Sequence, residues 1–336
     1  MATLREVAQQ AGVSIATASR VATGADNVRP ATRERVRRVM AELMYVPPRQ
    51  TTTIAGAIGL LVPELENPIF PALAQAMETR LRAFGFASIL CNTEGSINGE
   101  NDYTHMLLER QVAAMIFISC EGADLEADHR HYRRLVEEGA RLVFVNGAPQ
   151  TIDAPAVGID ERAAGHLATD HLLDHGHKRV GFLAGPKRFL PTQQKMEGRS
   201  AALVRRDLPP QDDLVVHESF GVEGGRRGLR RLLRHAEPPT GVICSSDLMA
   251  IGALLEAHTR GIAVPDELSV VGFDGVAAAT WTQPPLTTVE QPIAEIAEMA
   301  VNALWSMIEE PNQAIPNFLF RPRLREGGSV APPGAQ

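Results

Sequence analysis

Residues 4–21 constrain the N-terminal part of this chain more than any other feature of its sequence. A short amphipathic helix begins at residues 4–8, and Gly12 ends it with a residue suited to a tight turn. Ser14 then stands where its hydroxyl can cap a second helix over residues 15–21. Two short helices joined by a glycine turn predict a helix-turn-helix, whose second helix enters the major groove of DNA.

A third helix is expected to complete this N-terminal domain. Pro30 suits its first turn, and Val36, Val39 or Met40, and Leu43 recur at the spacing of one buried helix face. The opposite face carries four arginines: Arg33, Arg35, Arg37 and Arg38. The three helices therefore combine a small core with a basic surface.

Charge is divided unevenly along the chain. Residues 1–49 hold eight arginines and four acidic residues, a formal charge of +4, whereas the whole chain carries −7, so the remainder carries −11. A basic module on an acidic body is typical of a nucleic-acid-binding domain attached to a part that does not bind nucleic acid.

Together these features resemble the lactose-repressor/galactose-repressor family of bacterial transcription factors. The similarity is carried by the run TLREVAQQAGVSIATASRVATG…VRPATRERVRRVMAELMYVP and continues through nearly the whole chain. It implies a helix-turn-helix domain over residues 1–47, a hinge over 48–56, and an effector-binding and dimerisation core over 57–330. It also implies a homodimer bound to a pseudo-palindromic site in double-stranded DNA.

The resemblance assigns DNA contacts to the second helix, to residues that flank it and to the start of the third helix. Ile15 and Ala16 can touch a thymine methyl group, whereas Arg20 can donate two hydrogen bonds to a guanine. Two alternatives stay open: Ile15 could be a core residue, and Arg20 a solvated one. Other family positions contact phosphate, and here they are Ser14, Thr17, Asn27 and Thr32.

The hinge departs from the family pattern, which usually reads Tyr-x-Pro-Asn-x-x-Ala-x-x-Leu and forms a short helix whose leucine enters the minor groove. Counting from Tyr45, Pro48 replaces the asparagine, Thr51 the alanine and Ile54 the leucine. Consecutive threonines lower helix propensity, so we expect a hinge that is disordered or extended without DNA and forms a helix only on the operator, if at all. Ile54 is either the minor-groove wedge or part of the first core strand. Ile54→Ala would decide, because only loss of a wedge reduces operator bending.

From residue 57 onward, strand and helix patterns alternate. Apolar runs predict strands at residues 57–62, 87–92, 113–119, 141–146, 179–184, 241–246 and 269–274, and helical patterns lie at 70–84, 102–110, 132–138, 162–175, 222–234, 247–260 and 293–307. Such alternation predicts parallel sheets with helices on both faces.

The alternation occurs twice, with a break near residues 157–160. We therefore expect an α/β core of two doubly wound parallel-sheet lobes, like a periplasmic sugar-binding protein. The N-terminal lobe should take about residues 57–160 and 291–318, and the C-terminal lobe 161–290 and 319–330. The Gly/Pro-rich tail, residues 327–336, is expected to fray.

Effector contacts are expected beyond the carboxyl ends of the strands, where open α/β sheets bind ligands. Sugar recognition needs flat apolar faces for C–H groups and ionised or amide partners for hydroxyls. Family positions with this chemistry are Phe70, Asn146, Lys195, Phe220, Ser246, Asp247, Asp274, Trp281 and Gln291. The aromatic residues could instead merely cover the core.

Other function classes find less support. The cysteines Cys91, Cys120 and Cys244 form no CxxC pair, and neither a signal peptide nor a membrane span is expected, which favours a cytoplasmic protein. A metal site at His171, His175 and His177 is not favoured, no cofactor is expected, and nucleophile and metalloprotease motifs are missing.

We therefore predict a ligand-responsive, sequence-specific transcriptional regulator, most simply a repressor of sugar-utilisation genes. A purine- or nucleoside-responsive regulator of the same architecture is the first alternative, and a cytoplasmic solute-binding protein the second. An α/β enzyme is a further rival without a supporting motif.

Overall fold

The computed structural model of the protein describes residues 4–22, 28–43, 56–310 and 313–334. The chain divides into two compact units, Met1–Ala55 and Gly56–Gln336. Asn27 and Ile54, two of the expected DNA contacts, lie outside the described residues, and so does the hinge except for Gly56. The wedge at Ile54 therefore stays a prediction.

The first unit contains three helices, α1 (Leu4–Gln10), α2 (Ile15–Ala22) and α3 (Pro30–Glu42). Gly12 turns between α1 and α2 with a φ of 62°, a conformation that favours glycine. The Ser14 hydroxyl accepts a hydrogen bond from the Thr17 amide at 3.1 Å and caps α2. The helices share a small core of Val7, Ala8, Ala11, Ala18, Val21, Val36, Val39 and Met40. The predicted helix-turn-helix is confirmed.

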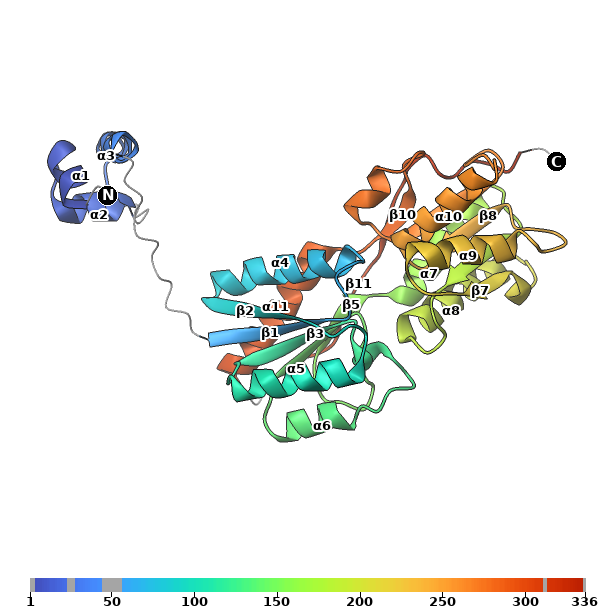
Figure 1. The fold of residues 1–336 in the computed structure, drawn as a ribbon, viewed down its shortest axis with the longest axis horizontal. Helices are drawn as coiled ribbons and strands as arrows, with labels where there is room; N and C mark the ends of the chain where they lie inside the picture. The colour runs from blue at the N-terminus through green and yellow to red at the C-terminus, as the bar shows by residue number, and fades with distance from the viewer. Residues whose placement is uncertain (1–3, 23–27, 44–55, 311–312, 335–336) are drawn as a thin grey trace. The chain divides into compact units, whose positions relative to one another are not determined.

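The second unit begins with a six-stranded parallel sheet in the order β11-β5-β4-β3-β1-β2. Its strands are β1 (Gly56–Val62), β2 (Phe86–Asn92), β3 (Ala114–Ile118), β4 (Leu142–Val145), β5 (Ala156–Ile159) and β11 (Phe318–Phe320). Helices α4 (Ile69–Ala83) and α11 (Ile293–Glu309) cover one face, and α5 (Ile97–Glu109) and α6 (Arg130–Glu137) cover the other (Figure 1). Because both faces are covered, nearly every strand residue is apolar.

A second six-stranded sheet follows in the order β12-β10-β9-β8-β6-β7, parallel except for its edge strand β12. Its strands are β6 (Val180–Ala184), β7 (Val215–His217), β8 (Gly241–Cys244), β9 (Ser269–Asp274), β10 (Thr287–Glu290) and β12 (Arg323–Arg325). Helices α7 (Glu161–Asp174) and α8 (Leu190–Arg205) pack together on one face, and α9 (Val222–Leu232) and α10 (Asp247–Thr259) on the other. The two predicted parallel-sheet lobes are confirmed.

The chain passes between the lobes three times. The first passage joins β5 to α7, the second joins β10 to α11, and the third joins β11 to β12. The third follows Phe320, whereas the sequence placed this boundary near residue 318. Each lobe is therefore completed by C-terminal segments that return from the other lobe.

Several elements escaped the sequence analysis, and α8 shows the reason most clearly. The buried face of α8 includes Thr192, Lys195 and Arg199, so its apolar periodicity is masked. Arg199 is satisfied in the core because its guanidinium donates to the carbonyl oxygens of Val180 and Gln211 at 2.8 and 3.0 Å. The strands that were not predicted are β5, β7, β10, β11 and β12, each of three or four residues.

The prediction that the C-terminal tail frays is wrong for its first part. Ser329 is fully buried, and its hydroxyl donates to the Val270 carbonyl at 2.6 Å and accepts from the Thr287 amide at 2.8 Å. The Ala331 amide donates to the Ser269 hydroxyl at 3.1 Å. Hydrogen bonds to the second sheet thus outweigh the flexibility that the tail's composition suggested.

Close packing of α7 against α8 depends on glycine. A Cβ atom added to Gly198 of α8 would lie 2.0 Å from the carbonyl oxygen of Arg162 in α7. A Cβ on Gly165 of α7 would lie 2.1 Å from the carbonyl oxygen of Lys195. The backbones of α7 and α8 are therefore in direct contact. This contact fixes the position of Lys195 on α8.

We expect Gly198→Ala to lower the free energy of unfolding by about 1–3 kcal/mol, because backbone atoms must shift to admit the methyl group. Gly56→Ala is the matched control, since its Cβ would meet the Phe86 ring at an ordinary 3.6 Å. Urea-induced unfolding, followed by circular dichroism, measures both. Equal stability of the two variants would contradict the close packing.

Candidate functional site

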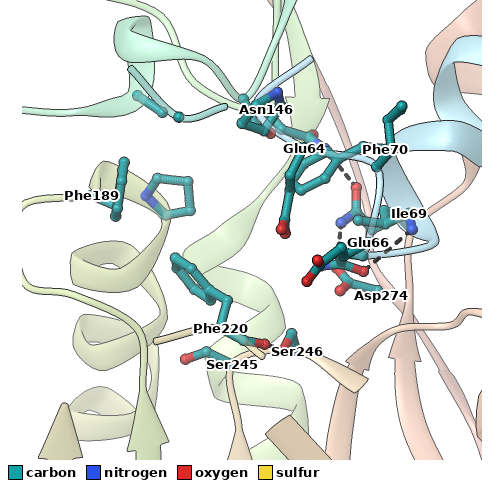
Figure 2. Close-up of a pocket in the computed structure, with 18 of the residues that line it drawn as sticks. Glu64, Glu66, Ile69, Phe70, Asn146, Phe189, Phe220, Ser245, Ser246 and Asp274 are labelled. Carbon is teal, nitrogen blue, oxygen red and sulfur yellow. Dashed lines mark hydrogen bonds between the residues drawn. The ribbon is translucent and has the colours of Figure 1, made fainter. Parts of the chain in front are cut away.

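A cavity of about 600 Å³ lies between the two lobes (Figure 2). Its walls are the segments that follow the carboxyl ends of strands in both sheets, as the doubly wound topology predicts. Seven of the expected effector residues line it: Phe70, Asn146, Lys195, Phe220, Ser246, Asp274 and Gln291. The cavity is within the size range of small-molecule sites.

A chain of hydrogen bonds connects the lobes at the inner end of the cavity. The side-chain amide of Asn146, after β4, donates to Oε1 of Gln291 at 2.8 Å. Nε2 of Gln291, on the second passage, donates to Oδ1 of Asp274 at 2.8 Å. Asn146 and Asp274 both have positive φ, 57° and 113°. Oδ1 of Asn146 is buried without a hydrogen-bond partner among the described residues, so it is an acceptor that a ligand can use.

Lys195 is held by a buried ion pair. Its Nζ lies 2.9 Å from Oε2 of Glu161 and 3.8 Å from the centroid of the Phe273 ring. Burial raises the pKa of Glu161, and the Lys195 ammonium opposes this shift. Asp160, the preceding residue, points elsewhere and caps α7 through the Ala163 amide at 2.8 Å.

The Asp274 carboxyl is buried in the cavity wall. Burial raises its pKa well above the usual range, and the nearby charge of Asp247 adds to the shift. Lys195 and the hydrogen bond from Gln291 act in the opposite direction. A carboxylate held here at a cost in stability is a candidate for ligand binding.

Asp247 does not line the cavity, which corrects its expected role. Its side chain is fully buried at the start of α10, where it accepts from the Thr288 hydroxyl at 2.6 Å and the Val276 amide at 2.8 Å. Burial raises its pKa to about 6. Asp247 thus ties α10 to β10 and to the turn after Asp274, and acts behind the cavity wall.

Trp281 was also expected in the cavity, and this prediction is wrong. The segment after β9 forms a short 3₁₀ helix, η3 (Ala277–Thr280), which packs against α10. Trp281 follows η3 on the outside of the second lobe and is 79% exposed. The aromatic residue that the sequence analysis missed is Phe189, before α8, with its ring 5.8 Å from that of Phe220.

Most of the other lining residues that sequence reasoning missed lie on loops after strands. They include Glu64, Leu65, Glu66 and Asn67 after β1, Glu94 and Gly95 after β2, Ser119 after β3, and Ser245 after β8. Their position after a predicted strand was the available signal. Glu161 is the first residue of α7, and nothing in the sequence pairs it with Lys195.

The lobes also touch beside Phe189. Asp124, after η1 (Glu121–Ala123), forms a β-bridge with Phe189, and the Leu125 amide donates to the Arg188 carbonyl at 2.8 Å. Nε of Arg188 lies 2.7 Å from Oδ2 of Asp124. The cavity is therefore closed on one side by contacts that a change in lobe orientation would break.

The helix-turn-helix presents a surface that suits DNA. Ile15 is 47% exposed, so the alternative that it is a core residue is wrong. Ala16 and Arg20 are also exposed on α2, as is Ser14 before it. Thr17 and Thr32 are half-buried at the start of α2 and α3. Basic side chains from α3 lie in the same unit, so an anionic duplex is a fitting partner.

Two other features bear on alternative functions. No helix in the described part of the chain combines the length and apolarity that a membrane span requires. His177, one of three histidines considered for a metal site, is buried and bonds the Thr240 and Ser269 hydroxyls at 2.9 and 3.0 Å. Its contacts are those of a core histidine.

Comparison with known proteins gives family matches for both parts of the chain. Residues 3–48 match the family described as bacterial regulatory proteins, lacI family, and residues 169–330 match a periplasmic binding protein-like domain. The HTH-type transcriptional regulator MalR of Streptomyces coelicolor is 39% identical over 98% of this chain and 96% of its own length.

Two further matches extend along the whole chain. The ribose operon repressor of Escherichia coli is 30% identical over 98% of this chain and 100% of its own length. The solved structure of a complex of the transcriptional regulator CelR with cellobiose has a TM-score of 0.74 and 29% identity, covering 98% of this chain and 100% of that one.

We expect Asp274→Asn to raise the free energy of unfolding of the ligand-free protein at neutral pH, because the buried carboxylate destabilises the fold. A carboxyl whose folded pKa is raised costs stability above its unfolded pKa, near 4, and the cost disappears as pH falls to that value. Asparagine keeps the oxygen that accepts from Gln291 and tolerates positive φ.

Urea-induced unfolding at pH 7.5 and at pH 5 measures this effect, with Asp266→Asn on the exposed surface as control. The gain for Asp274→Asn should be larger at pH 7.5 than at pH 5. A variant less stable than the parent at pH 7.5 would show that the Asp274 carboxylate stabilises the fold.

Proposed function

Because the chain belongs to the lacI family of bacterial transcriptional regulators, we propose that it is a repressor whose effector is a sugar. The helix-turn-helix and the two-lobed core make it a ligand-responsive DNA-binding regulator. Two relatives support a sugar in particular, since one is named a ribose operon repressor and the other is a complex with cellobiose.

The cavity itself is the observation that carries this proposal. Phe70, Phe189 and Phe220 supply flat apolar faces, and Asp274, Gln291 and Asn146 supply oxygens and amide groups at the inner end (Figure 2). Sugar rings offer C–H faces to the first group and hydroxyls to the second. A sugar bound here contacts both lobes at once.

We propose that binding changes how the lobes close, and that this change reaches the helix-turn-helix. A ligand between Phe70 and Phe220 favours one relative position of the lobes. The hydrogen bonds of Gln291 and the Asp124–Arg188 ion pair are the contacts that such a movement strengthens or breaks. A coupling of about 1–3 kcal/mol between the two sites is sufficient for regulation.

On DNA, we propose a homodimer with one α2 in the major groove of each half-site. The twofold axis then requires a pseudo-palindromic operator, with half-sites roughly 10 bp apart. Ile15 and Ala16 would meet thymine methyl groups, and Arg20 a guanine. Ser14, Thr17, Asn27 and Thr32 would hold phosphates. The regulator would act in the cytoplasm, without a catalytic activity of its own.

An exposed apolar surface supports the homodimer. Leu248, Ile251 and Leu255 recur along one side of α10, where Leu255 is 47% exposed, and η3 packs beside this helix. Apolar patches of this kind on the outside of a domain mark association surfaces. We propose that a second copy of the chain covers this apolar patch.

A purine or nucleoside is the alternative effector, because aromatic and amide groups also suit a base. A thermal-shift screen of the full chain against sugars, purines and nucleosides separates the two. A ligand at a hundredfold excess over its Kd stabilises the protein by about 2.7 kcal/mol. Stabilisation by a purine or nucleoside, with none by any sugar, would overturn the sugar proposal.

We expect Arg20→Ala to cost about 1–3 kcal/mol of operator affinity and to relax the preference at one base pair in each half-site. Selection from random duplexes defines the operator, and binding to single-base variants then measures the preference. Arg133→Ala, exposed on α6, is the charge-matched control. If Arg20→Ala weakens binding equally for all sequences, Arg20 contacts phosphate and reads no base.

We expect Leu255→Asp to convert the homodimer to monomers at micromolar concentration, because a carboxylate would be buried in the apolar interface. Light scattering after size-exclusion chromatography measures the mass. Val204→Asp is the control, since Val204 is 68% exposed on α8, away from this surface. A Leu255→Asp dimer would place the interface elsewhere.

A further inference from the structure

We propose that the effector is an uncharged sugar of at least two rings, and that Glu161 is the residue that makes the cavity reject phosphorylated sugars. This inference rests on the proposed sugar response and specifies the chemical class of the ligand. It follows from the charge of the cavity wall, the ion pair of Lys195, the capped starts of α7 and α10 and the extent of the apolar surface.

The cavity wall is strongly acidic. Five carboxyl groups line it, from Glu64, Glu66, Glu94, Glu161 and Asp274, whereas Lys195 is the one cationic side chain among the described lining residues. The first three stand on loops of the first lobe, and the other two belong to the second. An anion entering this cavity meets the acidic side chains of the first lobe, which oppose its binding.

The single cation is already neutralised. The carboxylate of Glu161 lies 2.9 Å from Lys195 Nζ, and the Phe273 ring covers the same group at 3.8 Å. Lys195 and Glu161 are both more than nine-tenths buried, so water screens their attraction only weakly. To bind a phosphate, Lys195 would have to leave Glu161 as an unpaired buried charge.

Two helix N-termini beside the cavity, those of α7 and α10, are capped by side chains. Helix N-termini bind phosphate through free backbone N–H groups. Here Asp160 accepts from the Ala163 amide of α7, and Ser246 accepts from the Met249 amide of α10 at 3.2 Å. At α8, Pro191 supplies no N–H group in the first turn.

The remaining polar groups suit neutral hydroxyls. The Ser246 hydroxyl donates to the Phe220 carbonyl at 2.7 Å, and the Ser245 hydroxyl accepts from the Gly185 amide at 3.3 Å. What stays open to the cavity is mainly a set of acceptors, the carboxylates of Glu64, Glu66 and Glu94. Sugar hydroxyls can donate to these acceptors, whereas a phosphate dianion cannot.

The apolar surface is larger than one sugar ring needs. Phe70 and Phe220 stand on different lobes next to the polar inner end, and Phe189 extends the surface along the second lobe (Figure 2). With a volume of about 600 Å³, the cavity has room for a second ring beside Phe189. The first ring would then lie near Asp274 and the second near Phe189.

Isothermal titration of the full chain tests the ligand class. The probes are glucose and ribose, the disaccharides cellobiose, maltose and trehalose, and the anions glucose 6-phosphate and trehalose 6-phosphate. We expect a disaccharide to bind more tightly than either monosaccharide, and trehalose 6-phosphate to bind roughly a hundredfold more weakly than trehalose, or not at all.

Three outcomes are decisive. If a phosphorylated sugar binds as tightly as the tightest-binding uncharged sugar, the inference that the cavity rejects anions is wrong. A monosaccharide that binds as tightly as the best disaccharide would overturn the two-ring inference. Both results leave a sugar-responsive regulator intact, whereas binding of no sugar in an extended panel would overturn the proposed function itself.

Glu161→Gln tests the role of the ion pair. It releases the charge of Lys195 into the cavity, so we expect the discrimination against trehalose 6-phosphate to narrow by about tenfold or more. Glu197→Gln on α8 is the matched control, because Glu197 forms an exposed ion pair with Arg162 outside the cavity. If a folded Glu161→Gln protein keeps the parental ratio of affinities for trehalose and trehalose 6-phosphate, Glu161 does not cause the rejection of anions.

A double variant, Glu161→Gln with Lys195→Gln, keeps the test decisive if the single variant does not fold. Removing both charges leaves the net charge of the cavity as it is in the parent. We therefore expect the parental rejection of trehalose 6-phosphate. A double variant that binds this anion as well as trehalose would show that Glu161 repels anions directly and that the pair is not a neutral unit.

Discussion

Parallel strands place all their carboxyl ends at one edge of a sheet, and in this chain those edges of two sheets border a single cavity. The three passages between the lobes hold the edges opposite each other. Residues far apart in sequence, such as Phe70, Asn146 and Asp274, therefore meet around one ligand-sized space. The binding site is a consequence of the connectivity before any particular side chain is considered.

The inner end of the cavity then concentrates buried polar groups that a purely structural core would avoid. Asp274, Glu161 and Lys195 are nearly inaccessible, and Asp274 carries a backbone conformation uncommon for residues with side chains. Such groups cost stability when they lack a ligand. The surrounding apolar clusters and the close helix pairs α7–α8 and α9–α10 offset this cost. Binding chemistry is thus supported by packing that lies outside the cavity.

The sequence predicted most strongly those features that a short pattern determines. Gly12, Ser14 and Pro30 mark the helix boundaries of the first unit, and apolar runs mark the long strands. It failed where tertiary contacts override local pattern. The buried face of α8 is polar because Arg199 and Lys195 find partners that only the fold supplies. Trp281 comes after strand β9, but the intervening η3 directs the chain to the outside of the lobe. No periodicity in the sequence predicts this short helix.

Glu161 shows why the ligand preference of the site could not be predicted from the sequence. Its neighbour Asp160 is a conventional helix cap, and two adjacent acids at a helix start would both suit the helix dipole. Only the contact between α7 and α8, set by Gly165 and Gly198, brings Lys195 to Glu161. The presence of a lysine at position 195 is therefore not enough to predict whether the ligand is charged. The same lysine would attract anions if α7 offered a neutral side chain, so specificity in this fold depends on pairs of residues and on the packing that joins them.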